Sequence, residues 1–229
     1  MRYIIILLFS VLLTQNAQSQ IYEVGVFAGG SNFIGDVGAT TYIAPNNLAI
    51  GGMFKWNRSP RHSWRISVTY AELDVKDSKS DDPRREARDF SFTNNLLEIS
   101  AGMEFTFFDF DLHELGIKST PYLYTGISTA KHDNFYYDNA GEIVSENTSS
   151  WAFGIPMALG FKTKMTEHLI LGAEIGARYT FSDEIDGSVP DFDNESSLAF
   201  GNTNSNDWYV FTGFTLTYTF GRRPCYCNY

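Results

Sequence analysis

Hydrophobic and polar residues alternate with a period of two along most of this chain. Eight stretches show the pattern, at residues 22–29, 48–56, 64–71, 97–107, 122–129, 153–162, 169–181 and 208–220. A period of two is the signature of a β-strand, because successive side chains point to opposite faces of the sheet. The stretches are close to the roughly 9–11 residues that a tilted strand needs to cross a bilayer. We therefore predict an all-β protein with eight strands.

The two faces of these strands differ in chemistry. One face carries bulky apolar side chains: Val24, Val26, Phe54, Ile66, Val68, Leu97, Ile99, Phe105, Ile155, Leu159, Leu171, Ile175, Val210, Phe214 and Leu216. The other face carries glycines, hydroxyls and eight ionisable groups, four of each sign: Glu23, Lys55, Arg65, Glu98, Glu104, Lys162, Glu174 and Arg178. A soluble ligand-binding barrel would place its large apolar side chains inside. The pattern instead predicts an eight-stranded antiparallel transmembrane β-barrel of the outer-membrane class, with its charges paired in a narrow lumen.

The connections between the predicted strands alternate in length, as they do in outer-membrane barrels. Short turns are expected at 57–61 and 163–167, a medium connection at 108–118, and long polar loops at 30–46, 74–90, 131–150 and 182–206. An even number of strands brings both termini to the same side of the membrane. We expect this to be the periplasmic side, with the short turns.

The ends of the chain have a different character from the strands. Arg2, an apolar run at 3–13 and the small residues Ala17 and Ser19 predict a cleaved secretory signal at residues 1–19. The barrel then covers residues 20–221, and residues 222–229 form a periplasmic tail. Among 229 residues the net charge is −10, which argues against a nucleic-acid partner, since nucleic acids are bound by clustered basic residues.

Candidate catalytic and metal-binding residues are few. Ser128 and His132 lie on one predicted strand, with His132 expected at its outer rim, but four residues of strand separate them by about 13 Å. That distance is too long for a nucleophile and its base, so we expect no catalytic residue and no enzyme activity. The loop at 183–195 holds six carboxylates, yet their spacing does not match a single-loop calcium site. We expect a solvated loop, no metal and no cofactor.

The tail contains both cysteines of the chain, Cys225 and Cys227. Only one residue separates them, so a bond between them would close a small, strained ring. The periplasm permits oxidation. A disulfide from Cys225 or Cys227 to a partner protein is one possibility, and a strained local bridge or free thiols are the others.

Three short blocks carry a family resemblance. They are Glu-Val-Gly-Val-Phe-Ala-Gly-Gly-Ser-Asn-Phe-Ile-Gly-Asp at 23–36, Lys-Trp-Asn-Arg-Ser-Pro-Arg at 55–61 and Glu-Phe-Thr-Phe-Phe-Asp-Phe-Asp at 104–111. With these blocks the chain resembles the PorG-like proteins, the outer-membrane β-barrel components of the type IX secretion system. The resemblance extends from about residue 21 to the Arg-Pro-Cys tail.

The resemblance implies a scaffold that docks the periplasmic ring of PorK and PorN to the membrane, for protein export and gliding motility. The ring would contact the periplasmic turns and the tail. Arg58 and Arg61, on a proline-stiffened turn, suit carboxylates on a partner, and Phe108 and Phe110 are candidate interface anchors, as are Cys225 and Cys227. The two phenylalanines could equally lie in the lipid headgroup layer. The alternative for the whole chain is an OmpA-type structural or small-solute barrel with no dedicated partner.

Overall fold

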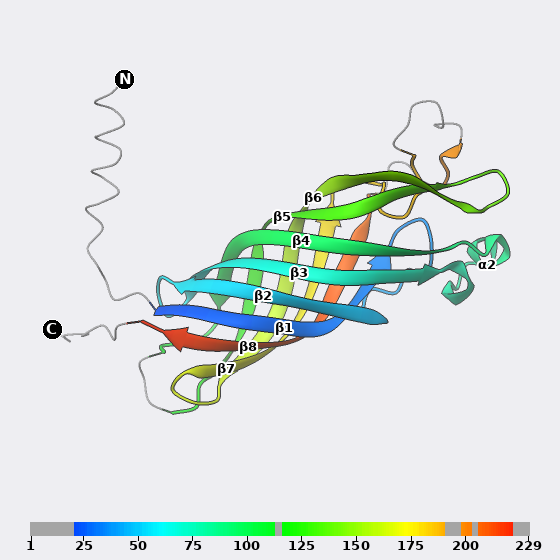
Figure 1. Ribbon diagram of the computed structural model, residues 1–229. Helices are drawn as coiled ribbons and strands as arrows, with labels where there is room; N and C mark the ends of the chain where they lie inside the picture. Colours follow the sequence, from blue (N-terminus) through cyan, green and yellow to red (C-terminus); the bar gives the residue numbers. More distant parts are fainter. Residues whose placement is uncertain (1–20, 113–115, 191–197, 203–205, 222–229) are drawn as a thin grey trace, which may run out of the picture.

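A computed structural model describes residues 21–112, 116–190, 198–202 and 206–221. The predicted signal peptide and the cysteine tail lie outside these residues. Eight strands form the molecule: β1 (Ile21–Ile34), β2 (Asn47–Asn57), β3 (His62–Lys76), β4 (Ser91–Thr106), β5 (Ser119–Tyr137), β6 (Ile143–Lys164), β7 (Leu169–Thr180) and β8 (Trp208–Phe220). Each strand pairs antiparallel with the next, and β8 pairs with β1, so that the sheet closes into a barrel (Figure 1). The predicted eight-stranded antiparallel barrel is confirmed.

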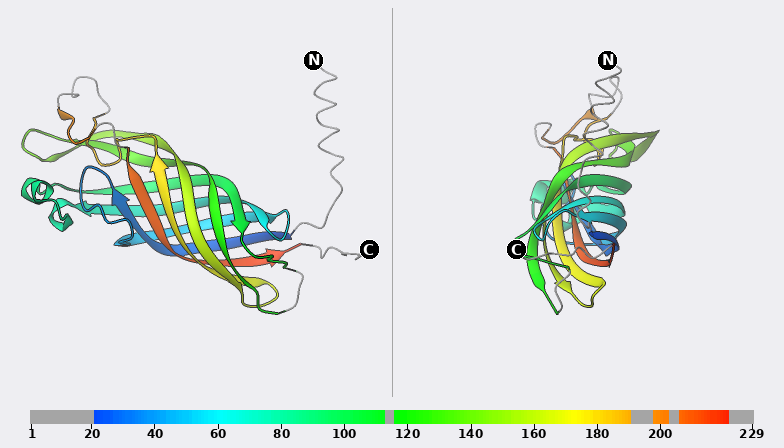
Figure 2. Two further views of the ribbon diagram at one scale, coloured as in Figure 1. Left: turned by 180° about the vertical axis from the view of Figure 1, so that it is seen from behind. Right: turned by 90° about the vertical axis from the view of Figure 1, so that its left-hand side faces the viewer.

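Several strands are longer than the sequence pattern predicts. The prediction of a loop at 131–150 is wrong, because β5 runs to Tyr137 and pairs there with Ile143 of β6. Figure 2 shows this hairpin reaching past the barrel wall at the end that holds the long loops. Strands β3 and β4 also continue, and between them lie a short 3-10 helix, η1 (Asp77–Lys79), and helix α2 (Pro83–Arg88). Neither helix in the described ranges is long and apolar enough to cross a membrane.

The outward face of the barrel is a band of exposed apolar side chains. It includes Val24, Val26, Phe54, Ile66, Val68, Leu97, Ile99, Leu159, Leu171, Ile175, Phe214 and Leu216, as predicted. An apolar band of this extent on a closed barrel is the surface that lipid covers.

Val210 is an exception, since it is only 2% exposed. It pairs with Asn32 of β1, and Asn32 holds the loop at 35–46 through Thr41, Tyr42 and Ala44. The prediction that Val210 faces lipid is therefore wrong. This position lies where a loop is fastened to the end of the barrel.

Two glycine pairs let neighbouring strands approach closely inside the barrel. A Cβ on Gly102 of β4 would lie 2.8 Å from the Cα of Gly126 on β5, and a Cβ on Gly29 of β1 would lie 2.5 Å from the Cα of Gly213 on β8. Both contacts are shorter than any side chain tolerates, so only glycine fits at these paired positions.

Candidate functional site

The eight ionisable residues predicted for the lumen are all buried inside the barrel. They project from β1, β2, β3, β4, β6 and β7, and tyrosines from β5 and β8 complete the arrangement. Every strand therefore contributes a polar side chain to this network. We call these ten residues the lumen network: Glu23, Lys55, Arg65, Glu98, Glu104, Tyr122, Lys162, Glu174, Arg178 and Tyr209.

Glu104 lies at one centre of the lumen network. Lys55 donates from Nζ to Glu104 Oε2 at 2.6 Å, and Lys162 donates from Nζ to Glu104 Oε1, also at 2.6 Å. Both ammonium groups also lie over the Tyr122 ring, at 5.4 and 5.6 Å from its centroid. One carboxylate thus bridges β2, β4 and β6, and a ring from β5 lies beside both cations.

A second centre is Glu174 of β7. The Arg65 guanidinium donates two hydrogen bonds to its carboxylate, one of them from Nη2 to Oε1 at 3.2 Å. The Tyr122 hydroxyl donates to Oε2 at 2.8 Å, which links this centre to the first. The Arg65 guanidinium also stacks over the Tyr124 ring at 4.6 Å.

The remaining acidic residues are satisfied in two ways. Glu98 accepts from Arg178 Nε at 3.0 Å and from the Tyr209 hydroxyl at 2.7 Å. Glu23 accepts from uncharged groups, Asn57 Nδ2 at 2.8 Å and Thr217 Oγ1 at 2.9 Å. Because a buried charge is costly unless it is paired or hydrogen-bonded, this interior holds one specific arrangement of side chains.

Sequence reasoning missed the uncharged members of this arrangement. Tyr122, Tyr209, Asn57 and Thr217 lie on the inward face, and strand alternation could have placed Tyr122 with Gly126, and Tyr209 with Gly213. Their partners could not be foreseen, since those depend on the register of strands that lie far apart in the sequence.

The connection between β4 and β5 folds back over the short-turn end of the lumen. Phe110 is 5% exposed, its backbone N–H donates to Pro60 O at 3.0 Å, and Lys162 Nζ lies 4.8 Å from its ring centroid. Lys164 Nζ donates to Leu112 O at 3.0 Å. The prediction that Phe110 is available to a partner is wrong, because its ring covers the lumen network.

The neighbouring predicted residues remain at the surface. Phe108 is 62% exposed. Arg61 is exposed and pairs with Asp109 at 2.5 Å, while the Arg58 guanidinium lies 5.8 Å from the Trp56 ring. Ile117 and Met165 add exposed apolar side chains from the same end. We call Arg58, Phe107, Phe108, Ile117 and Met165 the short-turn surface. Cys225 and Cys227 lie outside the described residues.

Ser128 and His132 both point into the barrel and are buried. The prediction that His132 closes its strand at the rim is wrong, because β5 continues to Tyr137.

At the long-loop end, carboxylates fasten one loop to another. Asp186 accepts from the backbone N–H groups of Asp36, Val37 and Ser188, and Asp207 Oδ2 accepts from Ile185 N. Burial raises the pKa of Asp207 well above its usual value, and the nearby Asp186 and Asp183 raise it further. Burial also raises the pKa of Asp183 to about 7. Across the described residues, no group of three or more histidine, cysteine or acidic side chains is placed to hold a metal ion.

The family model described as "Domain of unknown function (DUF6089)" matches residues 2–229. No curated protein matches the sequence. The structure is similar to the N-terminal β-barrel domain of Pseudomonas aeruginosa OprF, with 13% identity and a TM-score of 0.46, over 89% of this chain and 100% of that one. Neisserial surface protein A gives 12% identity and a TM-score of 0.48, over 88% of this chain and 97% of that one. A major outer membrane protein of Thermus thermophilus gives 14% identity and a TM-score of 0.47, over 88% of this chain and 99% of that one.

Proposed function

The chain belongs to this family of unknown function, and we propose that it is a non-enzymatic anchor in the bacterial outer membrane that docks a periplasmic protein assembly. The observation that carries the proposal is the filled interior. Seven charged side chains in ion pairs, together with buried tyrosines, occupy the lumen, and Phe110 covers one end of it. A barrel of eight strands with such an interior is suited to holding position in the membrane and not to conducting a protein substrate.

The resemblance to PorG-like barrels supplies the identity of the assembly, the ring of PorK and PorN in the type IX secretion system. In this proposal both termini and the short turns face the periplasm, and the ring contacts the short-turn surface. At this same end β8 finishes at Phe220, beside the start of β1, and the cysteine tail follows β8 in the sequence.

The short-turn surface has the composition of a docking site. Phe108 presents an aromatic ring, and Ile117 and Met165 present aliphatic and thioether groups, all exposed. Arg58 offers a guanidinium to a carboxylate of the partner, whereas Arg61 is already paired within the chain. Aromatic and arginine side chains contribute disproportionately to binding at protein interfaces.

Capture of partners from the native membrane tests this proposal. The chain, tagged and extracted in mild detergent, is expected to co-purify with the two ring subunits. The double variant Phe108→Ser with Arg58→Glu should lose most of this capture. The matched control is Phe181→Ser, which removes a phenylalanine of similar exposure (59%) at the opposite end and should retain it.

Two results would count against the proposal. Equal capture by the double variant and the control would exclude the short-turn surface, and absence of ring subunits from the wild-type sample would leave a barrel without this partner. Running the captured material without reductant also shows whether Cys225 or Cys227 joins a subunit, because such an adduct should disappear in the Cys225→Ser or the Cys227→Ser variant.

A further inference from the structure

The loop at 35–46 has a fixed shape, set by two asparagines. Asn32 is buried in β1, and its side-chain amide donates to Thr41 O at 3.1 Å and to Tyr42 O at 3.2 Å, while its Oδ1 accepts from Ala44 N at 3.3 Å. Asn46 donates from Nδ2 to Asp74 O at 3.0 Å. The loop is therefore held open against β1 and β3 as an arch.

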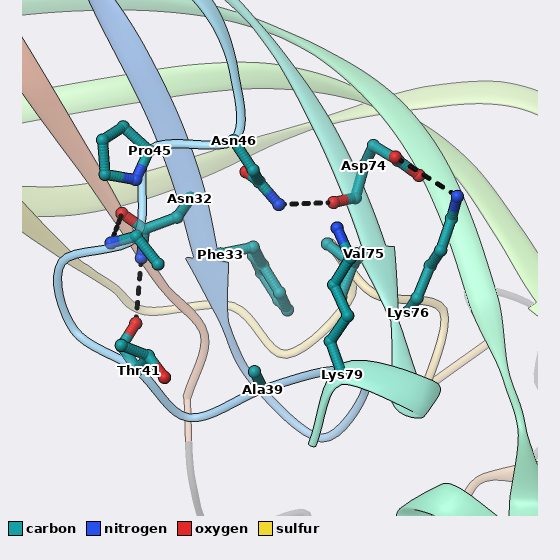
Figure 3. Close-up of a pocket in the computed structure, with 11 residues that line it drawn as sticks. Asn32, Phe33, Ala39, Thr41, Pro45, Asn46, Asp74, Val75, Lys76 and Lys79 are labelled. Carbon is teal, nitrogen blue, oxygen red and sulfur yellow. Dashed lines mark hydrogen bonds and ion pairs between the residues drawn. The ribbon is translucent and has the colours of Figure 1, made fainter. Parts of the chain in front are cut away.

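The arch and the end of β3 line a half-open pocket of about 390 Å³ (Figure 3). Phe33 and Val75 are buried residues that line it, and Ala39, Ala44 and Pro45 add further apolar surface. The volume lies within the range of small-molecule sites, which combine mostly apolar walls with a few polar groups.

The charges around the pocket are unequal. Lys76, Lys79 and Asp74 line it, so its net charge is one positive. The Lys76 ammonium is 3.6 Å from the Asp74 carboxylate, and this pair leaves Lys79 as the surplus cation. Figure 3 shows Lys79 extending from η1 beside the strand that carries Asp74 and Val75.

The segment that carries Lys79 is itself anchored. Asp77 of η1 is buried, and its carboxylate accepts from Gly38 N at 2.7 Å, Arg88 Nε at 2.7 Å and Phe90 N at 3.1 Å. These bonds tie η1 both to the arch and to the start of β4. The backbone that carries Lys79 is thus held in place before any ligand binds, which lowers the entropic cost of binding.

We propose that this pocket binds a small organic anion that carries an apolar group. The carboxylate or sulfonate of the ligand would lie against the Lys79 ammonium, and its ring or alkyl chain would lie on Phe33 and Val75. The proposal is independent of the docking function, because the pocket is at the opposite end of the barrel from the short-turn surface.

Fluorine NMR with 4-(trifluoromethyl)phenylacetate tests the proposal, using the full-length protein in lipid nanodiscs and empty nanodiscs as the blank. The probe signal should broaden saturably with protein. Lys79→Gln should weaken binding about fivefold, since it removes the charge-assisted hydrogen bond. Ala39→Trp, which fills the pocket, should abolish binding. Lys131→Gln removes an exposed lysine outside the pocket and should leave binding unchanged.

The uncharged amide of the same probe separates charge recognition from simple apolar partitioning. It should bind more weakly than the carboxylate to the wild-type protein and equally to the wild-type and Lys79→Gln proteins. The absence of saturable broadening, or binding that either Lys79→Gln or Ala39→Trp leaves unchanged, would overturn the proposal.

Discussion

The two halves of the barrel interior are built in opposite ways. Toward the short turns the interior is charged and holds the ion pairs of Glu104 and Glu174. Toward the long loops it is apolar, with Phe33, Leu73, Phe92, Leu96 and Phe135 among its buried members. Loop residues Val37 and Ile185 join this apolar core, so the loops are packed into the fold.

Strand β3 shows the reason for the difference within a single element. Its outward side chains are first apolar (Trp64, Ile66, Val68, Tyr70) and then polar (Glu72, Asp74, Lys76), whereas its inward side chains are first polar (Arg65, Ser67, Thr69) and then apolar (Ala71, Leu73, Val75). Where lipid surrounds the strand, apolar residues are needed outside and the interior is left to polar groups. Where water surrounds it, the ordinary preference for an apolar interior returns. The level of this exchange marks the edge of the membrane on the long-loop side.

The largest effect on stability is expected from a substitution in the charged half. Glu104→Leu leaves Lys55 and Lys162 buried without their carboxylate, which should lower the free energy of unfolding by about 3–5 kcal/mol. Urea denaturation of the protein folded in lipid vesicles measures it. Glu23→Gln is the control, because the partners of Glu23 are uncharged. It should lower the free energy of unfolding clearly less than Glu104→Leu does. If the two variants lost equal free energy of unfolding, charge pairing would not be what stabilises the charged half.

A slightly smaller effect is expected in the apolar half. Leu73→Ala creates a cavity in the long-loop core and should cost about 3 kcal/mol. Because Val37 and Ile185 pack in the same core, this variant should also speed protease cleavage within the long loops, which Glu104→Leu should not. The lipid-facing Leu97→Ala is the matched control, since lipid can fill the space. Loops that stay resistant in Leu73→Ala would argue that hydrogen bonds alone hold them.

The smallest effect is a pH dependence confined to the apolar half. The pKa of Asp183 is about 7, and the pKa values of Asp186 and Asp207 are also raised, so the folded loop binds protons more tightly than the unfolded loop. Its stability is therefore greatest at low pH and falls as the pH rises from about 4 through 7. Cleavage of the loop at 182–190 should be faster at pH 8 than at pH 5, after correction for protease activity.

Asp207→Asn tests the origin of that pH dependence. The amide oxygen can still accept from Ile185 N, but the group cannot ionise, so the variant should resist cleavage better at pH 8 and respond less to pH. The same pH profile in the variant and the wild type would assign the effect to other groups.

The barrel and its charged lumen could be predicted from the sequence, since alternation assigns each side chain to a face. The ends of the strands could not. On β3 the prediction stops at residue 71, where the apolar residues move from the outward to the inward face and the regular pattern breaks, although pairing with β4 continues to Lys76. The position of Phe110 could not be predicted from the sequence either, because it depends on a contact with Lys162, a residue about fifty positions away. The pocket beside Lys79 could not be predicted either, because the folded arch forms part of its wall.

Phe110 joins the short-turn surface to the barrel wall. A pull applied at Phe108 reaches Phe110 two residues along the chain, then Lys162, and through Glu104 the strands β2, β4 and β6. Tension from a partner bound at the short-turn surface would thus be shared among β2, β4 and β6 instead of acting on a single hairpin.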